Sequence, residues 1–478
     1  MRRIFQHILL LTGCFVQVVV LAQTDRISAS PSEISTGVAP AGDSLVMIAD
    51  IAISGNKRTK SYIIAREIPF RQGEYLLRSD LEKKLILAQE QVINTSLFIN
   101  ARVYIASIQG SLVFINVDVK ERWYLFPLPY FKLVDRNFNE WWVAEKRNLN
   151  RVNYGIKFTQ NNVSGRNDNL NIWLINGYNR QVNLSYNQPY ADRSLKNGYN
   201  ISLVYSSQHE LNYGTSFSKQ AFSKENDFAR TYLQIEASYL YRPAIKTRHT
   251  FSIGYIDDRI SDSIIKLNPG YFPGNVQRVR YPVFSYTLQY FDVDYIPYPL
   301  KGFMGDFSFS KKGVGRALNL WQFETHASYT MPFFGRTHLQ FQAGGILSLP
   351  FDQPFYTQQI LGYGDLYLRG LEYYVADGVA TGVGRFTLNK EIFSFTINPV
   401  LLGKTHDQIP FRFFLKTYGD LGYTYSKTPV NSLLDNRLLK TWGVGLDIVT
   451  VYDVVIKLEY SFNQLGNQGL FIHTRTDF

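Results

Sequence analysis

The chain has 478 residues, a formal net charge of +11 at pH 7 and an aromatic content of 15%. This length allows two or three domains. The positive charge does not predict a nucleic-acid partner, because the basic residues are spread along the chain, often near acids. Beyond the N-terminus the sequence has no apolar run of about eighteen residues, which excludes a transmembrane helix there.

Residues 1–22 predict a signal peptide. Two arginines precede the apolar stretch Ile4–Leu21, and the small residue Ala22 suits cleavage by a signal peptidase. Residues 23–45 are rich in Ser, Ala, Gly and Pro, and they show no apolar period. This segment therefore predicts a flexible lead-in to the folded part of the chain.

Cys14 offers a second interpretation of the N-terminal segment. Leu11–Cys14 resembles a lipobox, so Cys14 could carry a lipid anchor after cleavage. We favour simple cleavage, because cleavage before Cys14 would leave the apolar stretch Phe15–Leu21 at the mature N-terminus. Cys14 is the only cysteine, so a mature chain without it has neither disulfides nor a cysteine metal site.

Residues 46–121 predict a small α/β domain. The expected elements, in chain order, are a strand that ends in a Gly55-Asn56 turn, a helix over 61–67, a second helix, and strands over 97–106 and 111–121. Ser79 and Glu82 form a capping-box pattern at the start of the second helix. Its apolar stripe consists of Leu81, Leu85, Ala88 and Val92.

This order of elements, with "SGNKRT" (54–59), Gly73 and "VDVKE" (117–121), resembles a POTRA (polypeptide-transport-associated) domain. The sequence contains one such unit, with no second copy of its opening motif. The following residues, 122–150, are rich in aromatics and predict a linker near a membrane interface.

From residue 151 to 478 the sequence alternates apolar and polar residues and predicts an all-β transmembrane barrel. In "LQIEASYLY" (233–241) the apolar side chains share one face, and "IKLEYSF" (456–462) follows the same rule. Lipid requires an apolar exterior, whereas a watery lumen tolerates polar groups. We expect about sixteen antiparallel strands, an even number as single-chain bacterial barrels have. A soluble β-sandwich is the alternative.

The connections between these segments alternate in length. Short connections, such as 242–245 and 332–335, predict the periplasmic side, and long ones, such as 260–277, predict the extracellular side. The chain ends in "FIHTRTDF", and its last residue, Phe478, resembles the terminal aromatic of bacterial outer-membrane barrels.

A POTRA domain followed by such a barrel resembles the BamA/TamA-like outer-membrane assembly factors, also known as bacterial surface antigens. In that superfamily a long loop between the eleventh and twelfth strands folds into the lumen and carries a Val/Leu-Arg-Gly-Phe/Tyr tetrad. Here Leu368-Arg369-Gly370-Leu371 lies in the longest loop, about 350–378. Leu371 departs from the usual aromatic, and Tyr373 and Tyr374 are the candidates for the missing packing.

The resemblance also implies partners for Arg369 on the inner wall of the next two strands. Tyr418, Asp420 and Gly422 share one face and match the family's aromatic-x-Asp-x-Gly motif, and Glu391 resembles the acid of the preceding strand. A buried guanidinium is costly unless it is paired, and its fork geometry suits carboxylates. The resemblance therefore implies that Arg369 pairs with Asp420 and with Glu391; the alternative is a lone arginine on a surface loop.

The sequence predicts no enzymatic activity, no cofactor and no metal site. Its seven histidines are scattered, and neither a nucleophile elbow nor a cluster with metal-ligand spacing stands out. The glycine-rich segment 378–385 lacks the strand-to-helix context of a phosphate loop and predicts the start of a strand.

The resemblance implies a monomeric factor that assembles and inserts proteins in the bacterial outer membrane, with its POTRA domain in the periplasm. The POTRA edge would capture unfolded client strands by β-augmentation, and a barrel seam would open laterally. The implied partners are these clients, outer-membrane lipids and accessory lipoproteins. The main alternative is a protein-translocating secretion pore of the two-partner type for a dedicated substrate, and a passive porin is a third possibility.

Overall fold

The computed structural model describes residues 44–133, 151–315, 318–397, 409–429 and 432–474. The expected signal peptide, Cys14 and Phe478 lie outside the described residues, and so does nearly all of the expected lead-in. Within the described ranges, no helix combines the length and the apolar character needed to cross a membrane.

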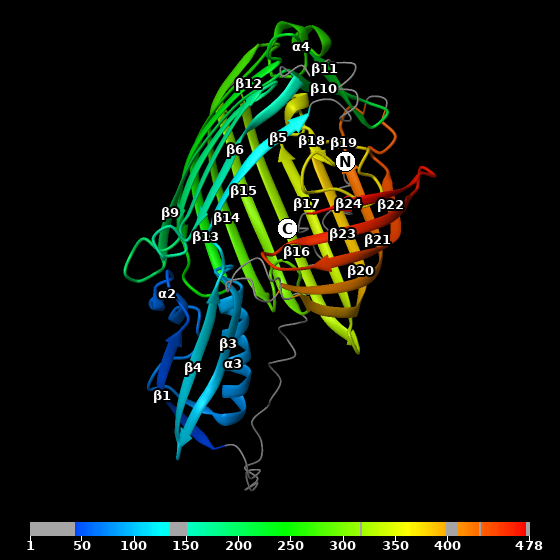
Figure 1. Cartoon of the computed structure of the whole chain (residues 1–478). Helices are drawn as coiled ribbons and strands as arrows, with labels where there is room; N and C mark the ends of the chain where they lie inside the picture. The colour runs from blue at the N-terminus through cyan, green and yellow to red at the C-terminus, as the bar shows by residue number, and fades with distance from the viewer. Residues whose placement is uncertain (1–43, 134–150, 316–317, 398–408, 430–431, 475–478) are drawn as a thin grey trace, which may run out of the picture. The chain divides into compact units, whose positions relative to one another are not determined.

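The N-terminal α/β domain has the predicted order of elements, with one short extra strand (Figure 1). Its elements are β1 (Leu45–Ser54), α2 (Ser61–Ala65), β2 (Tyr75–Leu77), α3 (Arg78–Ile93), β3 (Phe98–Gln109) and β4 (Leu112–Glu121). The sheet order is β2-β1-β4-β3, with β1 parallel to β4 and the other pairs antiparallel. Strand β3 is therefore a long edge strand.

Helix α3 buries the predicted apolar stripe, since Leu81, Leu85, Ala88 and Val92 all lie in the core of this domain. The capping-box prediction was wrong. The helix begins at Arg78 with Leu77 at the N-cap, so Ser79 lies inside the first turn and not at the cap. The short strand β2 ends directly at this point and fixes where the helix starts.

The glycine of the "SGNKRT" motif has a steric role. Gly55 has a φ of +84°, and a Cβ at this position would lie 1.9 Å from the carbonyl oxygen of Val119 in β4. Only glycine tolerates both the left-handed backbone and this close approach.

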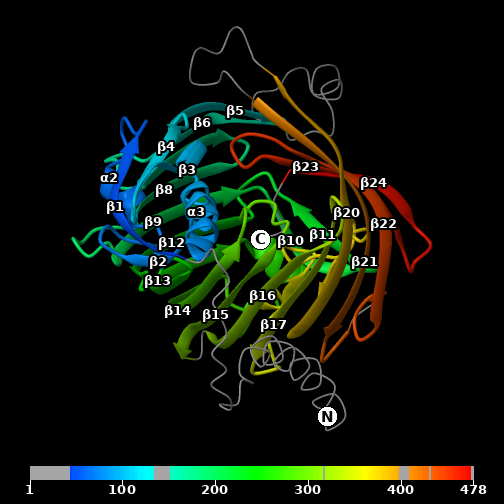
Figure 2. The same ribbon diagram turned by 90° about the horizontal axis from the view of Figure 1, so that it is seen from below.

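A single antiparallel sheet of sixteen strands accounts for most of the remaining chain, as the alternation predicts. Its strands are β5 (Leu125–Leu133), β6 (Val152–Asn161), β7 (Asn169–Gly177), β8 (Arg180–Gln188), β9 (Asn197–Gln208), β12 (Arg230–Tyr241), β13 (Thr247–Ile260), β14 (Arg278–Val293), β15 (Gly302–Gly315), β16 (Leu318–Phe334), β17 (Thr337–Leu349), β20 (Ala380–Ile397), β21 (Ile409–Tyr425), β22 (Leu438–Val449), β23 (Val455–Asn463) and β24 (Gln468–His473). Figure 2 shows these strands curving round from β5 to β24, the two ends of the sheet.

The sheet is polar inside and apolar outside. In β12 the exposed positions include Ile235 and Tyr239, whereas Ser238 is buried. In β23, Glu459 is 1% exposed and Tyr460 next to it is 39% exposed. A soluble protein shows the reverse arrangement, so the pattern matches a barrel with a lipid-facing exterior.

Strand β5 corrects the expected domain boundary. The predicted linker 122–150 contains this strand, which pairs with β6 over nine residues, so the barrel sheet starts before residue 151. Pro127 and Pro129 lie within this strand. The strand tolerates them because it is the edge of the sheet, where a missing backbone N–H need not break a ladder.

Connections of unequal length mark the two rims of the barrel. The short turns after β12 and β16 lie on one rim, as predicted. The long connections lie on the other rim. They include the hairpin of β10 (Glu210–Ser216) and β11 (Lys219–Lys224), a segment with helix α4 (Asp262–Leu267), and residues 350–379.

The connection 350–379 joins the eleventh and twelfth strands of the sheet, β17 and β20. It contains a short 3₁₀ helix, η3 (Phe355–Thr357), and the paired segments β18 (Gln359–Leu361) and β19 (Ala376–Asp377). The predicted tetrad lies between these two paired segments.

Candidate functional site in the barrel lumen

The tetrad forms a tight turn whose geometry explains its glycine. The carbonyl of Leu368 accepts a hydrogen bond from the backbone N–H of Leu371 at 3.0 Å, and Gly370 has a φ of +91°. A positive φ at the third residue is the mark of a type II turn, and glycine is preferred there. A Cβ on Gly370 would also lie 2.9 Å from the Cβ of Ser461.

Apolar side chains seat this turn on the inner wall. Leu368 and Leu371 are 1% and 4% exposed, and they belong to a cluster that also contains Val383 of β20 and Leu439 of β22. Gly422 of β21 makes room for the turn, since a Cβ there would lie 2.6 Å from the Cδ1 of Leu368. The predicted glycine of the Asp-x-Gly motif therefore lies directly under the loop.

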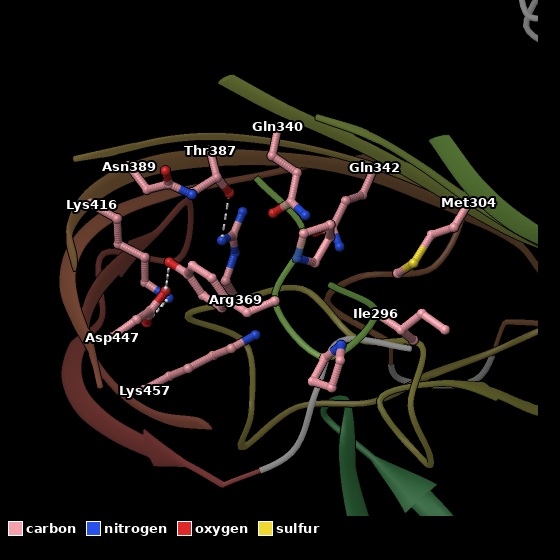
Figure 3. A pocket seen from close by; sticks show the side chains of 13 residues that line it. Ile296, Met304, Gln340, Gln342, Arg369, Thr387, Asn389, Lys416, Asp447 and Lys457 are labelled. Carbon is pink, nitrogen blue, oxygen red and sulfur yellow. Dashed lines mark hydrogen bonds and ion pairs between the residues drawn. The ribbon is translucent and has the colours of Figure 1, made fainter. Parts of the chain in front are cut away.

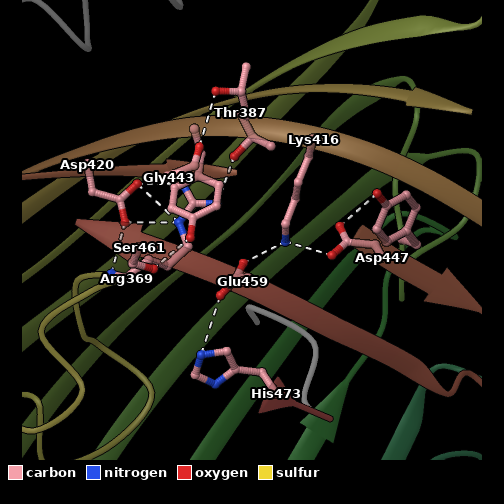
Figure 4. Close-up of polar contacts among 12 residues, drawn as sticks. Arg369, Thr387, Lys416, Asp420, Gly443, Asp447, Glu459, Ser461 and His473 are labelled. Carbon is pink, nitrogen blue, oxygen red and sulfur yellow. Dashed lines mark hydrogen bonds and ion pairs between the residues drawn. The ribbon is translucent and has the colours of Figure 1, made fainter. Parts of the chain in front are cut away.

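Arg369 is buried and paired with Asp420 (Figure 4). Its Nε donates to Oδ2 of Asp420 at 2.9 Å, its Nη2 donates to Oδ1, and its backbone N–H donates to Oδ2 at 3.0 Å. The two residues are 2% and 1% exposed. This is the bidentate geometry in which a guanidinium and a carboxylate satisfy each other away from bulk water.

Two further side chains complete the surroundings of the guanidinium. Nη1 donates to the hydroxyl of Thr387 in β20 at 2.9 Å. The ring of Tyr418 lies against the guanidinium, with 4.1 Å between Cζ and the ring centroid, a cation–π contact. The hydroxyl of Tyr418 is 2.7 Å from that of Ser461 in β23, so the turn is tied to three strands.

Glu391 does not fill its predicted role, which is a correction. Its carboxylate accepts a hydrogen bond from Nη2 of Arg412 at 2.7 Å, near the opposite end of β20 from the tetrad. The position that it was expected to take beside Arg369 is occupied by Thr387. Both residues lie on β20 with the same parity, so alternation alone could not distinguish them.

Of the two tyrosines that were candidates for the missing packing, Tyr374 packs against the apolar cluster and Tyr373 does not. Leu371 is itself buried in the apolar cluster, with Tyr374 packed at the edge of that cluster. Tyr374 also accepts a hydrogen bond from Asn467 at 2.8 Å. Tyr373 is 73% exposed and lies near the ring of Phe471 in β24.

Sequence reasoning missed a charged cluster deeper in the lumen. Lys416 of β21 lies between two carboxylates, 2.6 Å from Asp447 of β22 and 2.5 Å from Glu459 of β23. The hydroxyl of Tyr298, from the turn after β14, donates to Asp447 at 2.9 Å. One face of β21 carries Lys416, Tyr418 and Asp420. The alternation of the sequence therefore could have placed Lys416 on the lumen side, beside the predicted residues Tyr418 and Asp420.

A pocket lies where Arg369 meets this cluster. Figure 3 shows Arg369 among side chains from β17 and from β20 to β23. The lining of the pocket is mainly polar and includes Gln340, Gln342, Asn389 and Lys457. The surroundings are those of a polar lumen with fixed charges. The arrangement anchors a loop to the wall by ion pairs, and its described groups form no nucleophile–base pair that would suggest catalysis.

Comparisons with known families agree with this architecture. Residues 46–122 match the POTRA model described as "Surface antigen variable number repeat", and residues 162–374 match the Omp85 superfamily domain. A comparison with curated proteins found no significant match.

Among solved structures, BamA from Haemophilus ducreyi lacking POTRA domains 1–3 is similar with 16% identity and a TM-score of 0.49, covering 90% of this chain and 83% of that one. CdiB from Escherichia coli is similar with 11% identity and a TM-score of 0.45, covering 94% and 91%. CdiB from Acinetobacter baumannii is similar with 12% identity and a TM-score of 0.44, covering 90% and 73%. At these identities and TM-scores the three likenesses do not decide the function of this chain.

The two family matches together span more than half of the chain, in the same order as the two folded parts of the structure. Barrels of this superfamily are outer-membrane proteins with periplasmic POTRA domains, and its members are non-enzymatic transporters and assembly factors. The chain is a member of the Omp85 superfamily, with a POTRA domain ahead of its barrel.

Proposed function

We propose that this protein assembles and inserts other proteins into the bacterial outer membrane. The observation that carries the proposal is the combination of open strand edges in two sheets, within the described residues. They are the β3 edge of the POTRA sheet and the two terminal strands of the barrel sheet, β5 and β24.

The POTRA edge suits the capture of an unfolded client. Strand β3 is twelve residues long and has β4 as its one neighbour in the sheet order. Tyr104 and Ile108 on this strand are 42% and 43% exposed. An extended client segment can add to such an edge through main-chain hydrogen bonds, while exposed side chains contribute apolar contacts.

The barrel seam suits the insertion step. Strands β5 and β24 end the sheet, and within the described residues no ladder joins them. Strand β24 has only six residues, and β5 lacks two N–H donors at Pro127 and Pro129. A seam with few hydrogen bonds opens at a low free-energy cost, and an open edge pairs readily with a client strand.

The remaining parts of the proposal concern location and partners. We infer a monomeric barrel in the outer membrane, in contact with its lipids, with the POTRA domain in the periplasm. Unfolded outer-membrane proteins are the proposed clients, accessory lipoproteins are proposed helpers, and the protein itself is not an enzyme. The apolar exterior of the sheet and the superfamily match support this location.

Depletion of the protein in its native bacterium tests the proposal. We expect a broad decrease of β-barrel proteins in the outer-membrane proteome, restored by the intact chain but not by a chain that lacks the POTRA domain. Loss of one exported protein, with the other barrels unchanged, would contradict the proposal and support a dedicated two-partner secretion pore. A large steady conductance that survives POTRA deletion would instead indicate a porin.

A further inference from the structure

Three side chains that can bind a metal converge beside the tetrad. They are Glu372, two residues after Gly370, Glu459 of β23 and His473 of β24. One ligand atom from each lies within 4.8 Å of the other two. His473 Nε2 is 3.4 Å from Oε1 of Glu372 and 3.4 Å from Oε2 of Glu459, and Figure 4 shows the ring directed at Glu459.

These contacts are too long for charge-assisted hydrogen bonds, which measure about 2.7–2.9 Å. Oε1 of Glu372 and Nε2 of His473 are buried, and within the described part of the chain neither has a hydrogen-bond partner. Buried polar atoms without partners are rare in folded proteins, and a bound water or ion is one arrangement that satisfies them.

The second oxygen of each carboxylate is already engaged. Oε2 of Glu372 accepts from the backbone N–H of Gly370 at 2.8 Å, and Oε1 of Glu459 accepts from Lys416 at 2.5 Å. These bonds hold each carboxylate so that its other oxygen points toward His473. Such outer contacts are what orients the ligands of metal sites.

The two separations from His473, each 3.4 Å, fit a tetrahedral ion. Bonds of about 2.0–2.1 Å from a zinc ion to nitrogen and oxygen ligands place neighbouring ligand atoms about 3.3–3.4 Å apart. The ligand set has one imidazole and two carboxylates, which suits zinc and the neighbouring first-row divalent ions better than calcium. Two negative charges also offset the burial of a divalent cation.

We propose that Glu372, Glu459 and His473 bind a divalent transition-metal ion of the zinc class, with a water molecule in the fourth position. The site connects the loop to the last two strands of the sheet, and β24 is one side of the seam. Metal binding therefore holds the tetrad in the lumen and fixes the free edge of the barrel. The sequence did not predict this site, because its ligands are far apart and share no spacing motif.

The competing arrangement has no metal and instead a protonated His473 shared by the two carboxylates. Cobalt binding distinguishes this arrangement from a metal site. The full chain, folded in detergent without a histidine tag and carrying Cys14→Ser, is stripped with a chelator and titrated with Co²⁺ at pH 7.5. We expect one equivalent to bind, with the visible absorption of four-coordinate cobalt, and Zn²⁺ to displace it and raise the unfolding temperature.

The variants His473→Gln and Glu372→Gln should weaken Co²⁺ binding at least tenfold. The matched control is His249→Gln, a half-buried barrel histidine that contacts Tyr286, and it should bind as the parent does. Heat-modifiable migration on gels confirms that each variant is folded. The proposal is overturned if the folded parent binds no Co²⁺ at millimolar concentration, or if His473→Gln binds it equally well.

Discussion

At the scale of single residues, Arg369 is the group whose pairing the loop depends on most. Its side chain is 3% exposed, and its partners Asp420 and Thr387 come from two different strands. Removing one member of a buried pair leaves an uncompensated charge and typically costs about 3–5 kcal/mol. A hydrated lumen lowers that cost, because water reaches the remaining charge.

We therefore expect Arg369→Ala to destabilise the folded barrel by roughly 2–4 kcal/mol, measured by urea unfolding in detergent. The control is Arg278→Ala, because Arg278 also pairs with an aspartate, Asp257, but its side chain is 46% exposed. Exposed ion pairs contribute little because solvent screens them, so the control should leave the free energy of unfolding nearly unchanged. If both variants lost the same free energy of unfolding, the ion pair of Arg369 would contribute no more to stability than an exposed pair does.

Gly370 provides a second test of the turn. Gly370→Ala places a Cβ at a φ of +91° and 2.9 Å from Ser461, so we expect a loss of roughly 1–3 kcal/mol. Gly364→Ala in the same loop is the control, since a Cβ there meets nothing within 4 Å. Protease sensitivity of the loop should rise in the first variant only. Equal sensitivity of both variants would mean that the tetrad turn is not seated on the wall.

Asp435 predicts a dependence of stability on pH. It lies in the connection between β21 and β22, where burial, and then the charge of Asp377, raise its pKa from 3.8 to about 6. As pH rises from about 4 to 6 the unfolded chain loses this proton first, so the folded state loses stability and the loss persists at higher pH.

The variant Asp435→Asn should therefore be more stable than the parent at pH 7.5, by up to roughly 3 kcal/mol, and similar to it near pH 3.5. Unfolding by urea at both pH values measures the difference. The prediction fails if the variant and the parent differ equally at the two pH values, because a titrating carboxyl could not then be the cause.

How far these residues could be predicted depends on what each one contacts. Parity on one strand was enough to group Tyr418, Asp420 and Gly422. Parity could not separate Glu391 from Thr387, because both occupy the same face of β20 and only their height in the barrel differs. Lys416, Glu459 and His473 come from β21, β23 and β24, and they meet through the register of these nearby strands, which the alternation within a single strand does not give.

At the scale of elements, the edge strand β5 is the main difference between expectation and structure. Helix α3 and most barrel strands follow from their apolar periods, because each has one face against a core and one against solvent or lipid. Strand β5 contains two prolines and many aromatics, so its pattern is that of a linker. Strand β5 pairs with β6 over nine residues although its own sequence lacks the alternation of a strand, so this pairing depends on the neighbouring strand.

Bridging this edge to β24 should block client insertion if the seam opens during the reaction. Cysteine pairs scanned along β5 and β24, in a Cys14→Ser background, would be oxidised and assayed for client folding. The control pair replaces Tyr460 and Leu470, which face each other in the β23–β24 ladder and stay paired in either state. Insertion that continues at the parent rate in a fully bridged seam would exclude lateral opening.

At the scale of the whole molecule, the charges and the apolar surface are distributed as membrane insertion requires. The lumen holds the ion pairs of Arg369 and Lys416, and the exterior exposes large apolar side chains such as Ile253 and Phe251. The alternation predicts this distribution and the number of strands. The anchoring of the loop arises only when β20 to β23 are assembled side by side, because its contacts come from all four strands.

The most direct test of the proposed function is folding of a client by the purified protein. The chain is reconstituted in liposomes, a urea-unfolded outer-membrane barrel is diluted in, and its folding is followed by heat-modifiable migration and protease protection. We predict that folding is several-fold faster than in protein-free liposomes and that oxidised seam-bridged protein loses this effect. Client folding at the same rate with and without the protein would contradict the proposed function.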